Sequence, residues 1–305
     1  MNNLRSAIII PTYNGGLLWK KVAQSINKHY KGPVIVIDSG STDNTINIAE
    51  NNGFEVYRIK PEEFNHGRTR NYGVSLASSK CDIAIFLTQD AILQNDEAVS
   101  GLVEMIQDDD KLAAVYGKQL PHDDANPLAT HARYFNYADS GYILDEKNAK
   151  ALGLKSVFMS NSFAAYRVST FQEIGGFANN TILCEDMLYA ATALSSGFKV
   201  GYQPNSRVQH SHNYSAVEEF RRYFDIGVFH MDQSWIGQRF GGAQSAGSNF
   251  IRSELTYLAK NAPYYIPLAL INNSAKLLGY KLGKKYNLLP RGIVRKLSMH
   301  KKFWK

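Results

Sequence analysis

The first part of the chain alternates between short apolar runs and amphipathic stretches. Apolar runs rich in β-branched residues predict strands at residues 7–10, 34–38, 54–59 and 82–87. Apolar residues at helical spacing predict helices between them at residues 17–29, 41–52 and 66–78, the second with Ser41 or Thr42 as its N-cap. Strands that alternate with helices predict an α/β fold with a Rossmann-like, mostly parallel sheet and helices on both faces.

The pattern becomes mixed after about residue 95 and helical from residue 216 onward. The strands expected in the mixed part lie at residues 112–117, 157–166, 200–203 and 207–209. An amphipathic stretch at residues 185–196, followed by Gly197, predicts a helix among them. Small and polar residues at 243–248 predict a loop or hinge before the last helices.

The composition is that of an ordinary globular protein. A length of 305 residues allows one large α/β domain or two merged halves with an ample core. The two cysteines, Cys81 and Cys184, cannot form a disulfide framework and match no metal-binding spacing, so a reducing compartment is expected. With no signal peptide and no apolar run of about 20 residues, we expect a cytoplasmic protein, soluble or peripheral on a membrane.

The positive charge is concentrated at the C-terminus. No acidic residue follows Glu254, and the eleven lysines and arginines beyond it outnumber the net charge of +7, so the remainder is net negative. This asymmetry predicts a polyanionic partner. Because aromatic and aliphatic side chains are interspersed with the cations, an anionic membrane surface is slightly favoured over a packed helical pair with a solvated basic face. No nucleic-acid-binding motif is present, so nucleic acid is not expected.

Polar residues close the first two predicted strands, where ligands of parallel sheets bind. These residues are Pro11, Thr12, Tyr13 and Asn14 after the first strand, and Asp38 and Ser39 at the second. Their hydrogen-bonding groups suit a base or a ribose. An ordinary turn with an N-cap explains the pattern about equally well. The sequence contains no G-x-G-x-x-G, so the dinucleotide-binding fingerprint is absent.

A second polar cluster lies at the start of the third predicted helix and contains Gly67, Arg68, Arg70 and Asn71. Two arginines near a helix start can grip phosphate or stack on a base. The alternative is a solvated basic helix end. That alternative is weaker here because His66 and Asn71 lie in the same short segment as the arginines.

Acidic residues provide candidates for metal binding and for acid–base chemistry. Gln89 and Asp90 close the fourth predicted strand, where a carboxylate can hold Mg²⁺ or Mn²⁺ against a pyrophosphate. Glu185 and Asp186 open a predicted helix, where one carboxylate can serve as general base for a sugar hydroxyl. Taken singly, Asp90 reads more readily as a turn residue, and the acidic pair as a favourable complement to the helix dipole.

Two histidines follow the last predicted strand of the mixed part. His210 and His212 alternate, so their imidazoles lie on one face and either could complete a divalent-metal site with Asp90. A partly buried histidine bonded to the backbone is the better interpretation when this motif is taken alone.

The order of these motifs resembles that of the family 2 glycosyltransferases of the GT-A fold. The resemblance covers roughly residues 6–215 and includes residues 11–14, 38–43 and 70–73 together with Asp90, Glu185, Asp186 and His210. The segments E-F-N-H-G-R-T-R-N at residues 63–71 and T-Q-D-A at 88–91 are similar to the rhamnosyltransferases that build bacterial surface polysaccharide, such as O-antigen.

The resemblance implies a role for each matching residue. Thr12, Asp38 and Arg70 would contact the nucleotide. Asp90 would be the metal-binding aspartate of the D-x-D motif, and His210 a metal or diphosphate ligand. Asp186 would be the catalytic base, with Glu185 beside it. Thr88 stands where the family has the first aspartate of D-x-D, so the resemblance implies weak metal binding, or a metal held largely by the diphosphate, Asp90 and a histidine.

The resemblance also implies an inverting transfer from a nucleotide-diphosphate sugar, here dTDP-L-rhamnose, to a glycan or lipid-linked acceptor. Residues 1–215 would form the catalytic domain, with a nucleotide-binding half at 1–94 and an acceptor half at 95–215, followed by a basic helical region at 216–305. The alternatives are transfer from UDP-GlcNAc, UDP-Glc or UDP-Gal, or a non-catalytic nucleotide- or glycan-binding protein. A nicotinamide-dependent oxidoreductase is disfavoured because the glycine fingerprint is missing. The oligomeric state is not predicted.

Overall fold

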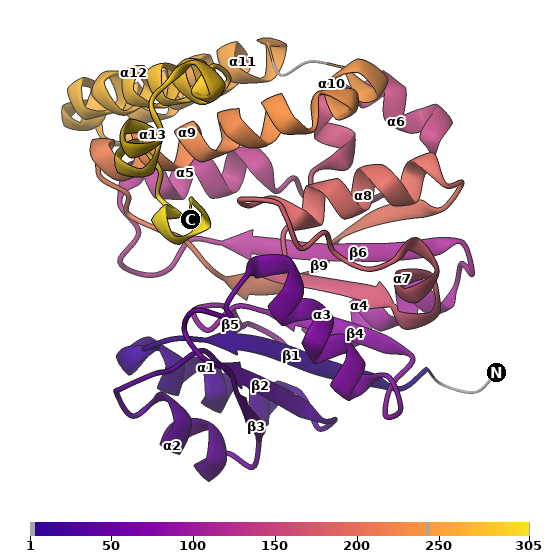
Figure 1. Cartoon of the computed structure of the whole chain (residues 1–305). Helices are drawn as coiled ribbons and strands as arrows, with labels where there is room; N and C mark the ends of the chain where they lie inside the picture. The colour runs from indigo at the N-terminus through magenta and orange to yellow at the C-terminus, as the bar shows by residue number, and fades with distance from the viewer. Residues whose placement is uncertain (1–3, 242–243, 305) are drawn as a thin grey trace.

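A mixed sheet runs through the centre of the molecule (Figure 1). The computed structural model describes residues 4–241 and 244–304. The strands of this part are Ser6–Thr12 (β1), Val34–Asp38 (β2), Glu55–Arg58 (β3), Ile83–Leu87 (β4), Ile92–Leu93 (β5), Leu112–Leu120 (β6), Tyr142–Leu144 (β7), Phe163–Arg167 (β8) and Lys199–Gln209 (β9). They lie in the order β3-β2-β1-β4-β8-β6-β9-β5, and β7 also pairs with β9.

The sheet is parallel in its N-terminal half and mixed beyond it. Strands β3, β2, β1 and β4 are all parallel neighbours, as the alternation of strands and helices predicts. Strand β8 then runs antiparallel to β4 and to β6, while β6 and β9 are parallel. The predicted α/β fold with helices on both faces is confirmed.

Helices cover both faces of the sheet because successive residues of its strands point to opposite sides. In β1, Ile8 and Ile10 belong to one core and Ala7 and Ile9 to the other, and none of the four is exposed. The first core includes residues of α1 (Gly16–His29), α2 (Thr45–Asn51) and α4 (Glu97–Gln107). The second includes residues of α3 (His66–Ala77), α7 (Val168–Ile174), α8 (Glu185–Ser195), α9 (Ala216–Asp232) and α10 (Ser234–Phe240).

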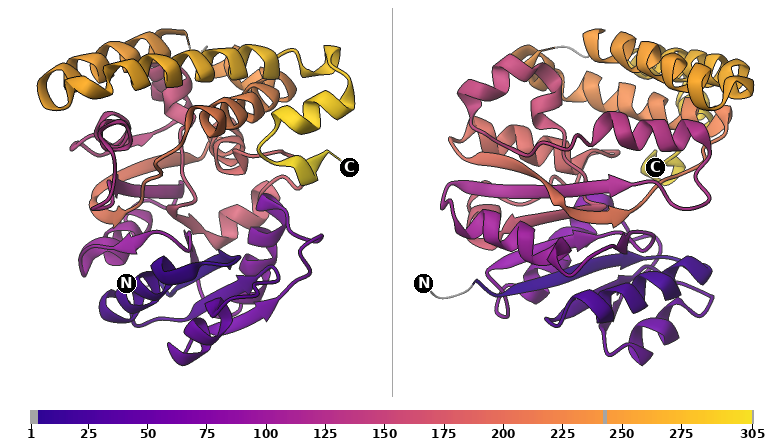
Figure 2. Two further views of the ribbon diagram at one scale, coloured as in Figure 1. Left: turned by 90° about the vertical axis from the view of Figure 1, so that its left-hand side faces the viewer. Right: turned by 180° about the vertical axis from the view of Figure 1, so that it is seen from behind.

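The predicted C-terminal helical extension is also confirmed, and it lies at the end of the molecule away from β1–β3 (Figures 1 and 2). Helix α12 (Ile266–Gly283) packs on α9 with their backbones in contact. A Cβ atom on Gly279 or Gly283 would lie 2.3 or 2.0 Å from a carbonyl oxygen of α9, so only glycine allows this approach. The remaining helices are α5 (Pro127–Asn136), α6 (Glu146–Leu152), α11 (Gln244–Asn261) and α13 (Arg291–Leu297).

The end of the chain folds back onto the body. The buried carboxylate of Asp225 accepts hydrogen bonds from the backbone N–H groups of Met299 and His300, each at 3.0 Å. Phe303 and Trp304 then pack against the core. The last described residues therefore lie beside α9 instead of projecting into solvent (Figure 1).

One predicted helix in the first half of the chain begins later than expected. Helix α2 begins at Thr45, not at residue 41, and its N-cap is Asn44, so the predicted caps Ser41 and Thr42 are wrong. Asp38 accepts hydrogen bonds from the backbone N–H of Ser41 and of Gly40, and this turn delays the helix.

Further differences lie in the second half. The strand predicted at residues 157–166 begins only at Phe163, because Gly153–Val157 forms a 3₁₀ turn and a loop follows. The two short strands predicted at 200–203 and 207–209 are one strand, β9, with an irregular register opposite Gly117 and Lys118. In the predicted loop at 243–248, Ala243 lies outside the described residues and α11 begins at Gln244, so most of this loop is helical.

Candidate active site

A cavity of about 300 Å³ opens at the carboxyl ends of β1, β2 and β4, where parallel sheets bind ligands. Its lining residues are Pro11, Thr12, Tyr13, Ser39, Pro61, Phe64, His66, Arg70, Thr88, Gln89, Asp90 and Lys302. This set defines the donor pocket. Seven of the residues predicted to bind a nucleotide sugar line it, namely Pro11, Thr12, Tyr13, Ser39, Arg70, Gln89 and Asp90.

Asp38 and Asn14 do not line the pocket but hold its loops in place. Asp38 has no exposed surface, and its carboxylate accepts hydrogen bonds from the hydroxyl groups of Thr12 (2.9 Å) and Ser41 (2.5 Å). The side-chain oxygen of Asn14 accepts a bond from the backbone of Thr42 at 2.8 Å. Both side chains therefore hold the loops that follow β1 and β2, and neither lines the cavity.

Gly67, Arg68 and Asn71 also do not line the cavity. Asn71 donates to the carbonyl of Phe177 at 2.8 Å and accepts from its N–H at 2.9 Å, which locks α3 to a segment of the second half. A Cβ atom on Gly67 would lie 2.1 Å from the carbonyl oxygen of Ala178, so glycine is needed for this contact. The Arg68 side chain is exposed, while its backbone N–H is capped by Asn65.

Gln89 holds the edge of the pocket in place. Its side-chain oxygen accepts from the N–H of Tyr13 at 2.8 Å, and its amide donates to the carbonyl of Tyr13 at 3.1 Å. The pair of bonds fixes the backbone after β1 against the backbone after β4. The half-exposed ring of Tyr13 is thereby positioned at the mouth of the pocket.

Asp90, His210 and His212 form a candidate metal centre at one side of the pocket. Their ligand atoms all lie within 4.8 Å of one another. The Nε2 atoms of His210 and His212 are 3.4 and 3.7 Å from the two carboxylate oxygens of Asp90. Burial, followed by the charge of His210, lowers the pKa of His212 to about 4, so its imidazole is neutral at neutral pH, as a metal ligand must be. These residues fit a divalent cation.

A second layer of hydrogen bonds orients His210. The side-chain oxygen of Gln119 accepts from the guanidinium of Arg133 and lies 2.9 Å from Nδ1 of His210. Because arginine can only donate, that Gln119 atom is an acceptor, and Nδ1 of His210 must carry the proton. The Nε2 atom then faces Asp90. Metal-binding histidines are usually oriented in this way by a bond from their other ring nitrogen.

Glu185 forms a buried ion pair with Arg70. The Glu185 carboxylate lies 3.1 Å from the Arg70 guanidinium and accepts from the Asn161 amide at 2.9 Å, and both charged side chains are almost fully buried. Burial acts to raise the pKa of Glu185, but the Arg70 charge, together with smaller contributions from His66 and the Asn161 hydrogen bond, outweighs it and lowers the pKa below its usual value. Glu185 is therefore ionised, and its carboxylate is occupied by the ion pair with Arg70 and the hydrogen bond from Asn161.

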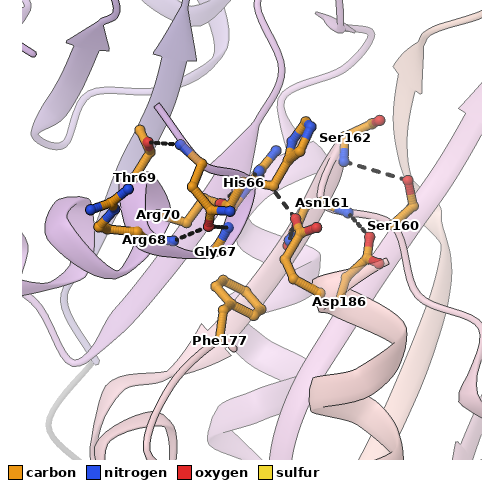
Figure 3. A network of polar contacts seen from close by, with 12 residues as sticks. His66, Gly67, Arg68, Thr69, Arg70, Ser160, Asn161, Ser162, Phe177 and Asp186 are labelled. Atoms are coloured by element: carbon orange, nitrogen blue, oxygen red, sulfur yellow. Dashed lines mark hydrogen bonds and ion pairs between the residues drawn. The ribbon is translucent and has the colours of Figure 1, made fainter. Parts of the chain in front are cut away.

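Asp186 lies beside Asn161 (Figure 3) and is bonded to backbone N–H groups. One of its carboxylate oxygens accepts from the N–H of Asn161 at 2.9 Å, and the other from the N–H of Met187 at 2.8 Å. Burial, and then the charge of Glu185, raises the pKa of Asp186 to about 7. A carboxylate with such a pKa can accept a proton at neutral pH and is suited to act as a general base.

Hydrogen bonds connect Asp186 with the metal centre. Asp186 holds Asn161, and the preceding residue, Ser160, accepts from the Gln119 amide at 2.8 Å. Gln119 in turn holds His210, which faces Asp90. Arg70, which lines the donor pocket, pairs with Glu185, and Glu185 in turn accepts a hydrogen bond from Asn161. One network of contacts thus connects predicted residues from both halves of the chain, while Glu185, Asp186, His210 and His212 do not themselves line the donor pocket.

Sequence reasoning did not identify several residues of this site. Pro61, Phe64 and Lys302 line the pocket, and Gln119 and Asn161 orient its acidic and imidazole groups. Phe64 lies in the motif segment at residues 63–71, which was a usable signal. The other four carry no local pattern, because their placement depends on strand pairing and on the return of the C-terminus.

The amino-acid sequence matches the family model described as Glycosyl transferase family 2 over residues 7–175. It is 49% identical over 304 residues to O-antigen chain rhamnosyltransferase RfbN of Salmonella typhimurium, covering 99% of this chain and 96% of the relative. It is 48% identical over 300 residues to O-antigen chain rhamnosyltransferase WbaN of Salmonella anatum, with 97% and 95% covered.

Similar solved structures support the fold. The mannosyltransferase PcManGT from Pyrobaculum calidifontis, in complex with GDP-Man and Mn²⁺, has a TM-score of 0.58 at 18% identity and covers 100% of this chain and 86% of its own. S. aureus TarS 1–349 in complex with UDP-GlcNAc has a TM-score of 0.56 at 15% identity, with 93% and 92% covered. At these identities the likeness extends to the fold alone.

Proposed function

The chain belongs to glycosyl transferase family 2 and is a glycosyltransferase, and we propose that it transfers L-rhamnose from dTDP-L-rhamnose to a glycan acceptor with inversion. The observation that carries the proposed chemistry is the placement of Asp186, a carboxylate with a pKa near 7, in a network that also holds the candidate metal centre. The identity of nearly half of all residues to two O-antigen chain rhamnosyltransferases, over nearly the whole chain, supports rhamnose as the sugar.

The nucleotide of the donor is proposed to occupy the donor pocket. Thr12, Tyr13 and Ser39 supply hydroxyl and backbone groups for the base and ribose, and Phe64 supplies an apolar surface. The diphosphate would then lie near Asp90, Thr88 and the metal centre at the end of β4. Asp38 and Asn71, both candidates for nucleotide binding from the sequence, would act by holding the pocket loops and α3.

Asp90, His210 and His212 would hold the divalent cation. When bound there, the cation neutralises negative charge that develops on the departing diphosphate. Two imidazoles beside a single carboxylate favour Mn²⁺ over Mg²⁺, because Mg²⁺ prefers oxygen ligands and keeps most of its water. Thr88 replaces the first aspartate of the family motif, so the histidines would supply ligands that a second carboxylate would otherwise provide.

Asp186 would act as the general base. It accepts the proton of an acceptor hydroxyl while that oxygen bonds to the anomeric carbon and the bond from this carbon to the diphosphate oxygen breaks. The attack occurs on the face opposite the leaving group and inverts the configuration. A β-linked dTDP-L-rhamnose therefore gives an α-L-rhamnoside, with the proton on Asp186 and dTDP released.

A donor comparison tests the sugar and the nucleotide together. Purified protein is incubated with an acceptor glycan and with dTDP-L-rhamnose, UDP-GlcNAc, UDP-Glc or UDP-Gal in turn. The proposal expects product from dTDP-L-rhamnose with an α-linkage. Product from UDP-sugars alone would contradict rhamnose while leaving the glycosyltransferase assignment intact.

We further propose that the basic C-terminal region docks on an anionic membrane carrying a lipid-linked acceptor, on the cytoplasmic side. Among the described residues, no helix is long and apolar enough to cross a bilayer. Helix α12, however, exposes apolar side chains along its length, and no acidic residue occurs in the chain after Glu254. Its exposed apolar residues include Leu270, Ile271, Leu277 and Leu278. An apolar face flanked by cations suits the surface of an anionic bilayer.

A further inference from the structure

Lys302, three residues from the end of the chain, is part of the donor pocket. It is the only C-terminal residue among those that line the cavity, since the other lining residues all come from residues 11–90. It lies in a short 3₁₀ turn, Lys301–Phe303. The fold therefore brings a cation from the far end of the sequence to the mouth of the nucleotide site.

Anchors on both sides of Lys302 hold the backbone there. Before it, Asp225 binds the N–H groups of Met299 and His300, and the His300 ring packs edge-on against His66 of the pocket with centroids 4.9 Å apart. After it, Trp304 packs against Tyr286 with ring centroids 5.4 Å apart. The side chain of Lys302 is exposed between these anchors and lines the cavity, so it is accessible to a ligand there.

The charges that line the pocket leave a role for this lysine. Arg70 is paired with Glu185, so its charge is already compensated. Burial lowers the pKa of His66, which favours its neutral form. Asp90 contributes a negative charge. Among the described residues, Lys302 has no ion-pair partner, so its charge is available to a ligand.

We propose that Lys302 contacts the diphosphate of the nucleotide sugar and compensates part of its charge in the donor complex and as dTDP departs. This inference rests on the proposed function, because it needs a nucleoside diphosphate in the pocket. Ammonium groups bind phosphate oxygens through charge-assisted hydrogen bonds. Such a contact is formed by the protein alone, so it operates whether or not a metal ion is bound.

The test compares binding of dTDP by Lys302→Gln and Lys301→Gln, measured by titration calorimetry in Mn²⁺ and again in EDTA. Lys301 is a matched control because it is an exposed lysine on the same turn that does not line the cavity. Lys302→Gln should weaken dTDP binding about tenfold in both buffers, the loss expected for one charge-assisted contact. Lys301→Gln should bind like the wild type, and Lys302→Arg should recover most of the affinity.

The salt dependence of dTDP affinity distinguishes a phosphate contact of Lys302 from a purely structural role. If its ammonium meets phosphate, the Lys302→Gln variant should also show a weaker dependence of dTDP affinity on salt concentration. Equal dTDP affinities of Lys302→Gln and Lys301→Gln would overturn the inference, whether both variants bind like the wild type or both bind more weakly. A wild-type protein that binds neither dTDP nor UDP would contradict the proposed function itself, a result distinguishable from the failure of Lys302 alone.

Discussion

The guanidinium of Arg70 lies 3.1 Å from the carboxylate of Glu185, and this buried pair joins the two halves of the molecule at the active site. Arg70 comes from α3, beside the donor pocket, and Glu185 from the first turn of α8. Because the charges of Arg70 and Glu185 compensate each other and the pKa of Glu185 is lowered, Asp186 is the member of the acidic pair that titrates near neutral pH. Of the two adjacent acidic residues, Glu185 therefore stabilises the structure through its ion pair, and Asp186 is the one proposed to take part in the chemistry.

Replacement of Glu185 by Gln should be costly for stability. The substitution leaves the Arg70 charge buried without its partner, which typically costs about 3–5 kcal/mol. We expect a clear fall in thermal stability, measured by calorimetry, relative to Glu173→Gln, a control in the neighbouring helix α7. A Glu185→Gln protein as stable as that control would contradict the structural assignment of the pair.

The pH dependence of transfer should report Asp186. Its pKa is raised to about 7, and the base must be ionised, so kcat/KM should fall as the pH drops below about 7. If the base were an aspartate with an ordinary pKa, kcat/KM would not fall until the pH approached about 4. The measurement is a pH–rate profile of rhamnosyl transfer between pH 5 and 9. A value of kcat/KM that stays unchanged from pH 8 down to pH 5 would show that the acceptor proton is not taken by a carboxylate in this environment.

Gln119 should control metal affinity without touching the metal. Because it holds the proton of His210 on Nδ1, Gln119→Leu should lower the affinity for Mn²⁺ by about 10- to 100-fold. Gln209→Leu is the matched control, since Gln209 precedes His210 but its amide donates to Asp123. Mn²⁺ binding is measured directly by calorimetry or by electron paramagnetic resonance. Unchanged Mn²⁺ affinity in Gln119→Leu would remove the orienting role.

Membrane docking should depend on the exposed face of α12. Substitution of both Leu277 and Leu278 by Asp places charge where the proposal puts lipid, and binding to vesicles containing phosphatidylglycerol should fall at least about tenfold. Leu152→Asp, on α6, changes an equally exposed leucine and should have no effect. Sedimentation with vesicles gives the bound fraction. Equal binding of all three proteins would exclude α12 as the docking surface.

The N-terminal half of the fold could be predicted from the sequence because its strands are continuous apolar runs. The mixed half was harder. Pro204 interrupts the hydropathy of β9 although the strand continues through it. Phe158 and Met159 extend the apolar run of β8 in the sequence, yet residues 158–162 form the loop that binds Asp186. Periodicity reports burial, and Met159 is buried in a loop as Phe163 is in a strand, so an apolar side chain alone did not mark where β8 begins.

The candidate site was predictable as far as residues lie at strand ends. Thr12 ends β1, Gln89 and Asp90 follow β4, and all three line the pocket. Asp38 also lies at a strand end, but its carboxylate accepts hydrogen bonds from Gly40 and Ser41 in the following turn. Whether such a residue lines the pocket or holds the turn depends on the direction of its side chain, which the sequence does not give. Lys302 could not be placed, because no local pattern indicates that the basic tail returns to the nucleotide site.

The measurement that bears most directly on the account is turnover by Asp186→Asn. Asparagine keeps the size of the side chain but cannot take the acceptor proton. Transfer from dTDP-L-rhamnose should fall by at least about a hundredfold, while the Kd for dTDP stays within about twofold of the wild-type value, since the donor pocket is intact. Transfer at the wild-type rate with unchanged dTDP binding would contradict Asp186 as the base.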